Sequence, residues 1–348
     1  MTEPENGRRT WAGLQTWRTF WFRPQPAYTL GLVRLAFGAV VIGWTVSLLP
    51  DLYALFGPHG VDPQQPEDAY QWGVFAIWTS DHALLIGWIL LLVSSVALMI
   101  GWHSRLAGLA VFVLILSFEH RDVWVFNSGD LAVRIEALFL AISPCGAALS
   151  LDQVHSTGKF WSAQQRPQWP VRLMQVQLSL IYLASAQAKL SGNAWPQGTA
   201  VSYALRLPDM LLLRTPHWFT TSALLMNAVT WGTLAVELSV GILVWNRRLR
   251  PWVLAAGVVM HTMMMITIAV GFFSLAVFVL YLAFVPPEMV ERLPRSAKDM
   301  ARKLVAAFAR PRPKSTNQTE NSGSTEDKGV FAEPRTESPS GARTTAED

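Results

Sequence analysis

A polar stripe on an otherwise apolar helix is the feature of this sequence that most plainly suggests chemistry. The run from residue 173 to residue 190, LMQVQLSLIYLASAQAKL, is nearly long enough to cross a bilayer. Helical spacing places a set of residues that ends in an amine on one face: Gln175, Ser179, Tyr182, Ala186 and Lys189. Ionisable groups at membrane depth are costly and usually face a cavity or a partner. Lys189 is therefore a candidate base, and the alternative is an interfacial lysine whose amine reaches water from the helix end.

Other residues near membrane depth could assist such a base. His261 lies in the middle of an apolar block and is read either as a proton relay or as a histidine satisfied by a neighbouring helix. Asn127, Ser128 and Asp130 form a polar turn just before another apolar run. Asp130 is read either as part of the site or as the cap of the helix that follows it.

The composition indicates a membrane protein. The chain has 348 residues, of which 51% are hydrophobic and only 15% charged, with sixteen tryptophans and a mean hydropathy of +0.27. Its apolar residues occur in blocks near the ~20 residues that a spanning helix needs. We therefore predict an all-α, polytopic helical membrane protein with about eight transmembrane helices. The single cysteine, Cys145, excludes an internal disulfide and a cysteine-based metal site, and we expect no metal.

The apolar blocks divide the chain into three parts. Residues 1–27 are a charged, tryptophan-rich segment expected at the cytoplasmic membrane surface, residues 28–287 the transmembrane domain, and residues 288–348 a basic stretch followed by a disordered cytoplasmic tail. The last block, 252–285, is tight for two spans, and a break is expected at Val270–Gly271. Seven spans are the alternative, but they would place the basic tail outside the cell.

The distribution of basic residues predicts the orientation. With eight spans, fifteen Lys and Arg residues fall on the side of both termini and three on the opposite side. Because an excess of Lys and Arg marks the cytoplasmic side, we expect a plasma-membrane protein with both termini in the cytoplasm. The basic residues lie at membrane edges, so the bilayer and not nucleic acid is the expected partner. Arg34 and Glu237 are expected at similar depth, which predicts a structural ion pair between them.

Several short motifs in a familiar order give the sequence a resemblance. They are RPQPAYTLGLVRLAFG, NSGDLAVR, the SLD at 150–152, IYLASAQAKLSGNAWPQG, AVELSVG around Glu237, and the segment from His261 to VGFFS. Together they resemble the HTTM domain, the membrane domain shared by vitamin K-dependent gamma-carboxylases and many bacterial proteins. The resemblance extends over roughly residues 20–287.

The resemblance implies a quinone chemistry. In the carboxylases a lysine deprotonates vitamin K hydroquinone within a pattern that this chain matches at Tyr182, Lys189, Leu190, Trp195 and Gly198. Lys189 would then be the base and reduced vitamin K (menaquinol) the cofactor. The resemblance also places the cofactor between Lys189, Tyr182, Trp195 and the turn at 127–130.

The sequence departs from the carboxylases in two places. Their loop histidine before the fourth span is replaced by the turn around Asn127, where either Asp130 holds the lysine or Asn127 donates to a quinol oxygen. The large lumenal region is replaced by about sixty polar residues, so the quinol-handling half of a carboxylase- or epoxidase-like lyase activity is expected more than carboxylation. The alternative is a non-enzymatic membrane factor for maturation, export or immunity of a secreted peptide. The expected partners are thus the bilayer, a quinone and a secreted peptide or protein.

Overall fold

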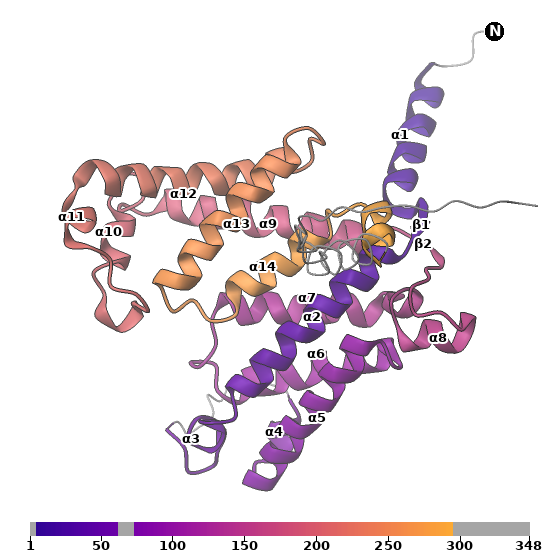
Figure 1. Cartoon of the computed structure of the whole chain (residues 1–348), viewed down its shortest axis with the longest axis horizontal. Coiled ribbons are helices and arrows are strands. Elements are labelled where there is room, and N and C mark those ends of the chain that lie inside the picture. The colour runs from indigo at the N-terminus through magenta and orange to yellow at the C-terminus, as the bar shows by residue number, and fades with distance from the viewer. Residues whose placement is uncertain (1–4, 62–72, 295–348) are drawn as a thin grey trace, which may run out of the picture. The chain divides into compact units, whose positions relative to one another are not determined.

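The computed structural model describes residues 5–61 and 73–294, with side chains described from residue 13 onward, and these residues are almost entirely helical (Figure 1). Most of the predicted basic stretch and all of the predicted disordered tail lie outside the described residues, which end at residue 294. The α-helices are α1 (Glu5–Phe22), α2 (Tyr28–Ser47), α3 (Leu52–Phe56), α4 (Val74–Ile77), α5 (Asp81–Ile100), α6 (Ser104–Arg121), α7 (Ser128–Ile142), α8 (Leu151–Thr157), α9 (Trp169–Ser191), α10 (Ala200–Ala204), α11 (His217–Thr221), α12 (Ala223–Leu243), α13 (Arg250–Thr267) and α14 (Phe273–Leu282). Short 3₁₀ turns, Cys145–Ala147 and Pro208–Met210, and two strands, β1 (Pro24–Pro26) and β2 (Gln165–Pro167), complete the described part.

Membrane-compatible helices lie in the predicted blocks. Within the described residues, α2, α5 and α12 are each long and apolar enough to cross a bilayer, and the bent pair Phe273–Leu282 and Pro287–Pro294 would make a fourth span. The fold is therefore all-helical with a membrane-spanning character. Helices α6, α7, α9 and α13 occupy the other predicted spans without meeting the same criteria of length and hydropathy.

Local sequence signals explain where these helices begin and end, as α5 illustrates. The Ser80 side chain accepts a hydrogen bond from the backbone of Ala83 at 3.3 Å and caps the first turn. Gly101 ends the helix at φ +74°, a left-handed conformation that glycine adopts without steric cost. The apolar run between these two signals is the 20-residue helix.

The last apolar block is broken as predicted. Helix α13 ends at Thr267 and α14 begins at Phe273, so the predicted break at Val270–Gly271 is confirmed. Gly271 has φ +57° in the intervening turn. The break brings α14 back along α13, which places His261 of α13 opposite the side chains of α14.

Helix α14 holds the described helices together. Helices α2, α5, α6 and α7 pack in series, and α9, α12 and α13 form a second packed group. Helix α14 packs against α2, α7, α9 and α13, so it contacts members of both groups (Figure 1). The antiparallel pairing of β1 with β2 ties the start of α2 to the segment before α9, with Gln25 opposite Arg166.

Arg34 stabilises the fold without a carboxylate partner. Its side chain is fully buried and donates to the backbone carbonyls of Leu98, Met99, Cys145 and Leu149, the Cys145 bond measuring 3.2 Å. The carbonyls of Leu98 and Met99 lie in the last turn of α5, where helix carbonyls lack their usual backbone partners, and the Leu98 carbonyl also accepts from the backbone of Gly101 at 3.1 Å. The predicted Arg34–Glu237 pair is therefore wrong, because helix-end carbonyls take the guanidinium and another cation takes Glu237.

Candidate functional site

The polar stripe of α9 faces the protein. Gln175 donates to the backbone carbonyl of Ala283 at 2.7 Å, and Ser179 accepts from the indole of Trp245 at 2.9 Å. Tyr182 and Lys189 follow on the same stripe and also contact other helices. Lys189 thus points from α9 toward α12.

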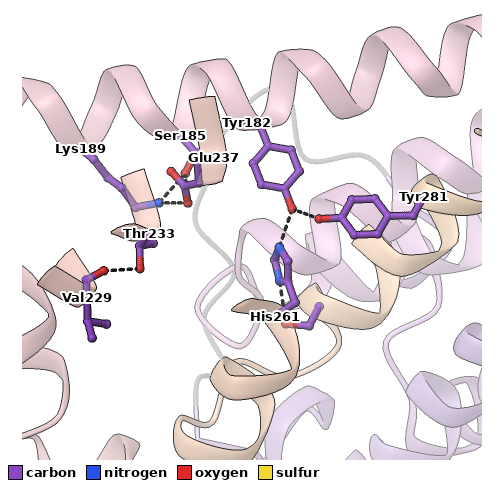
Figure 2. Close-up of polar contacts among 9 residues, drawn as sticks. Tyr182, Ser185, Lys189, Val229, Thr233, Glu237, His261 and Tyr281 are labelled. Carbon is purple, nitrogen blue, oxygen red and sulfur yellow. Dashed lines mark hydrogen bonds and ion pairs between the residues drawn. The ribbon is translucent and has the colours of Figure 1, made fainter. Parts of the chain in front are cut away.

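Lys189 forms an ion pair with Glu237 of α12. The Lys189 ammonium donates to Glu237 Oε1 and, at 2.7 Å, to the hydroxyl of Ser185 one turn earlier on α9 (Figure 2). It also lies 5.0 Å from the ring centroid of Trp195, a cation–π contact. The Lys189 side chain is 21% exposed and that of Glu237 only 8% exposed, so the pair lies at the edge of the buried region.

Glu237 keeps one carboxylate oxygen free. Its Oε1 takes the bonds from Lys189 and Ser185, whereas Oε2 is buried and has no hydrogen-bond partner among the described residues. A buried acceptor without a partner costs free energy, and such atoms often mark the place where a ligand or water binds. Glu237 Oε2 is therefore the open position of the ion pair.

A second polar chain lies deeper in the same helix group. The hydroxyl of Tyr182 makes hydrogen bonds with His261 Nε2 at 2.7 Å and with the hydroxyl of Tyr281 (Figure 2). On its other side, His261 Nδ1 is 3.0 Å from the hydroxyl of Ser274. All four side chains are buried, and each hydroxyl and ring nitrogen can serve as donor or acceptor. These side chains therefore form a continuous run of buried hydrogen bonds, in which His261 is held by residues of the neighbouring helices α9 and α14.

The ion pair and the tyrosine–histidine chain lie near each other along α9. Tyr182 and Lys189 are seven residues apart, two helical turns or about 10 Å along α9. Glu237 acts electrostatically on both tyrosines, and Lys189 acts on His261. Figure 2 shows Tyr182, Ser185 and Lys189 pointing from α9 to the same side. The structure thus brings together the predicted residues Lys189, Tyr182, Trp195 and His261.

The turn at Asn127–Asp130 serves as a helix cap. The Asn127 side chain accepts from the backbone of Gly129 at 2.7 Å, and Asp130 Oδ2 accepts from the backbone of Asn127 at 2.7 Å. The other oxygen of Asp130 accepts from the Trp44 indole at 2.8 Å. The capping interpretation of Asp130 is confirmed, and the carboxylate that holds Lys189 is Glu237, not Asp130. Ser128 is exposed.

The sequence predicts that Lys189 and the turn at Asn127–Asp130 line one cavity. The two best-defined cavities in the described residues contain neither Lys189 nor this turn. A cavity of about 460 Å³ lies instead around His103, Arg105 and Arg166. The turn reaches the tyrosine–histidine chain only through packing, because Gly129 lies against the backbone of Phe273, the residue before Ser274. A side chain larger than hydrogen at Gly129 would clash with Phe273, since an added Cβ would lie 2.7 Å from the Phe273 Cβ.

Sequence analysis missed three members of the site and assigned the wrong partner to a fourth. Glu237 was identified but given another partner, while Ser185, Ser274 and Tyr281 were not singled out. Ser185 lies four residues before Lys189, a spacing that brings two side chains together on a helix. Ser274 and Tyr281 belong to α14, and no local pattern reveals that α14 faces His261 and Tyr182.

The fold and these contacts define a helical membrane domain with a lysine–glutamate pair beside a buried tyrosine–histidine chain. The chain belongs to the HTTM domain family, whose match extends over residues 22–289. This membership relates the domain to the membrane domain of vitamin K-dependent carboxylases. Comparisons with curated proteins and with solved structures gave no match.

Proposed function

We propose that the Lys189–Glu237 pair is a proton-handling site for a reduced quinone of the vitamin K (menaquinol) type. The observation that supports this most directly is the unpartnered, buried Glu237 Oε2 next to the Lys189 ammonium. A ligand hydroxyl fits this donor and acceptor set, because Oε2 accepts its proton and the ammonium stabilises negative charge beside it. Trp195 and the apolar helix walls suit an aromatic ring.

The residues of the chain divide the work between them. A bound reduced quinone would supply an acidic hydroxyl and reducing equivalents. Glu237 accepts a proton at Oε2, and Lys189, held by Ser185, passes a proton within the pair. The Tyr182–His261–Ser274 chain lies about two helical turns along α9 from the pair, and no hydrogen bond among the described residues joins the two, so its role in this proposal is to hold α13 and α14 beside α9. The pair, and not an isolated amine, is thus the base in this proposal.

The proposal includes a topology with eight spans in the plasma membrane and both termini in the cytoplasm. In the proposal seven of these spans are α2, α5, α6, α7, α9, α12 and α13, and the eighth is α14 together with the helix Pro287–Pro294 that follows it. Labelling of single-cysteine variants tests this topology. The variants carry Cys145→Ser, so that the buried native cysteine cannot contribute to the labelling. A Val61→Cys variant should react with a membrane-impermeant maleimide from outside and a Lys159→Cys variant only after lysis. The reverse pattern would overturn the topology.

The oxidation of reduced menaquinone by air tests the chemistry. The protein is placed in lipid nanodiscs, and the reaction is monitored by the absorbance of the quinone. Wild type should oxidise the reduced form faster than empty nanodiscs do, and Lys189→Ala and Glu237→Gln should each lose at least ~100-fold of the excess rate. Lys159→Ala, which removes an exposed lysine elsewhere, should keep the wild-type rate. Equal rates for wild type and both site variants would overturn the proposal.

A non-enzymatic role in maturing, exporting or giving immunity to a secreted peptide is the second candidate. The segment between α9 and α12 presents exposed apolar side chains, with Leu212 64%, Leu213 57% and Trp218 69% exposed. Such side chains suit contact with a peptide. In that case wild type should show no quinol oxidation, and a triple change of these residues to serine should abolish the peptide-linked phenotype while Lys189→Ala retains it.

A further inference from the structure

A second site lies away from the lysine–glutamate pair, at the end of the domain that the basic residues assign to the cytoplasm. It is the cavity of about 460 Å³ between the start of α6, the turn after α7, α8 and the segment leading to β2. Its walls include Arg105, Arg166 and His103, together with the amide and hydroxyl side chains of Gln153, Gln164 and Ser156. Three basic side chains thus meet in one hollow of the surface.

The acidic residue of this cavity, Asp152, makes its hydrogen bonds to the start of α6. Asp152 Oδ1 accepts from the backbone of His103 at 2.8 Å, and Oδ2 accepts from the backbone of Ser104 at 2.9 Å and from its hydroxyl at 2.7 Å. Its carboxylate is therefore used to cap the first turn of α6. Neither arginine has an ion pair with a carboxylate in the described part of the chain.

The polar wall is built and held in place. Gln153 is 2% exposed, and its side-chain oxygen accepts from the amide of Gln164 at 3.0 Å. Gln164 in turn accepts a hydrogen bond from the guanidinium of Arg166. This arrangement holds Arg166 at the cavity, and Arg105 lines the same cavity from the first turn of α6. Two guanidinium groups over one hollow are a donor set that fits phosphate oxygens.

Apolar side chains adjoin the charged hollow. Leu106 lines the cavity and is 68% exposed, and the neighbouring Trp102 is 49% exposed. Leu109, one turn further along α6, is 49% exposed. Large apolar side chains exposed beside a basic pocket suit acyl chains below a headgroup, and tryptophan is enriched at that level of the membrane.

We infer that this cavity binds the phosphate of an anionic phospholipid from the adjacent leaflet, with Arg105 and Arg166 on the phosphate oxygens and Leu106 against the acyl chains. The shared chemistry, a phosphate anion, could also come from free phosphate. The exposed apolar side chains beside the arginines favour the lipid.

Native mass spectrometry of the full-length protein in detergent tests this inference with phosphatidylglycerol, phosphatidylcholine and inorganic phosphate as separate probes. Wild type should retain phosphatidylglycerol at least ~10-fold more tightly than phosphatidylcholine. The double change Arg105→Gln/Arg166→Gln should remove this preference, since each charge-assisted hydrogen bond to phosphate contributes ~1.5–3 kcal/mol, or roughly tenfold or more in affinity. The matched control Arg247→Gln/Arg248→Gln removes two exposed arginines from the α12–α13 turn and should keep it.

Three outcomes would count against the inference. Equal retention of the two lipids by wild type would overturn it. Equal loss in the control variant would show general attraction of lipid to basic surface, and inorganic phosphate that displaces phosphatidylglycerol at millimolar concentration would identify a free anion as the ligand. The thermal unfolding midpoint in phosphatidylcholine is the folding control. A midpoint of Arg105→Gln/Arg166→Gln equal to that of wild type shows that the variant is folded. If that variant is unfolded, the single change Arg105→Gln at an exposed position takes its place and should reduce the preference for phosphatidylglycerol.

Discussion

Removing either charge of the Lys189–Glu237 pair should destabilise the protein, and removing the lysine charge should cost more than removing the glutamate charge. Lys189→Met leaves Glu237 buried without a cation, and breaking a buried pair in this way costs ~3–5 kcal/mol. Because the Lys189 side chain is 21% exposed, part of the attraction is screened, and we expect ~2–4 kcal/mol. Glu237→Gln leaves an ammonium that can turn to water, and we expect ~1 kcal/mol.

The double variant Lys189→Met/Glu237→Gln decides whether the pair is coupled. Once the lysine is absent, removing the carboxylate charge should be neutral or stabilising, so the double variant should be more stable than the sum of the single effects by at least ~1 kcal/mol. Reversible unfolding by SDS in mixed micelles, followed by the fluorescence of the sixteen tryptophans, measures all of these variants. Lys159→Met, at an exposed position, serves as the control. Additive effects, or a Lys189→Met cost equal to that of the control, would refute the assignment of a buried ion pair.

Three further predictions concern charged groups outside the pair. Arg34→Lys should lower the free energy of unfolding by ~2–4 kcal/mol in the same assay, because an ammonium cannot reach carbonyls of α5 and of the turn after α7 together; an unchanged midpoint would contradict this. Burial opposes ionisation of Asp152, but hydrogen bonds from Ser104 and His103 outweigh it and lower its pKa below 3.8. Its stabilisation is therefore present above the unfolded-state pKa and lost as the pH falls through the lower folded-state pKa, and Asp152→Asn should remove this loss of stability below about pH 4. Glu136→Leu should stabilise by ~1–2 kcal/mol, since both oxygens of this 1%-exposed carboxyl lack a partner in the described residues; a loss of quinol oxidation instead would assign Glu136 to the chemistry.

The stripe on α9 and the helical blocks could be predicted because they depend on local periodicity. A residue's place on a helix face is fixed by its spacing along the chain, so Tyr182 and Lys189 could be assigned to one face. The break before α14 could be predicted for the same reason, since glycine and the length of the block mark it within a few residues. Asp130 as a cap followed from its position just before an apolar run.

The sequence by itself determined the helices, the stripe and the lysine, whereas only the tertiary structure decided which charges meet. The similar depth of Arg34 and Glu237 along their helices suggests that they pair. Depth alone does not say which neighbouring helix each side chain faces. Packing of α12 against α9 presents Glu237 to Lys189, and the carbonyls at the end of α5 take Arg34. A buried charge binds the partner that its helix faces, and that face depends on how helices far apart in the sequence pack.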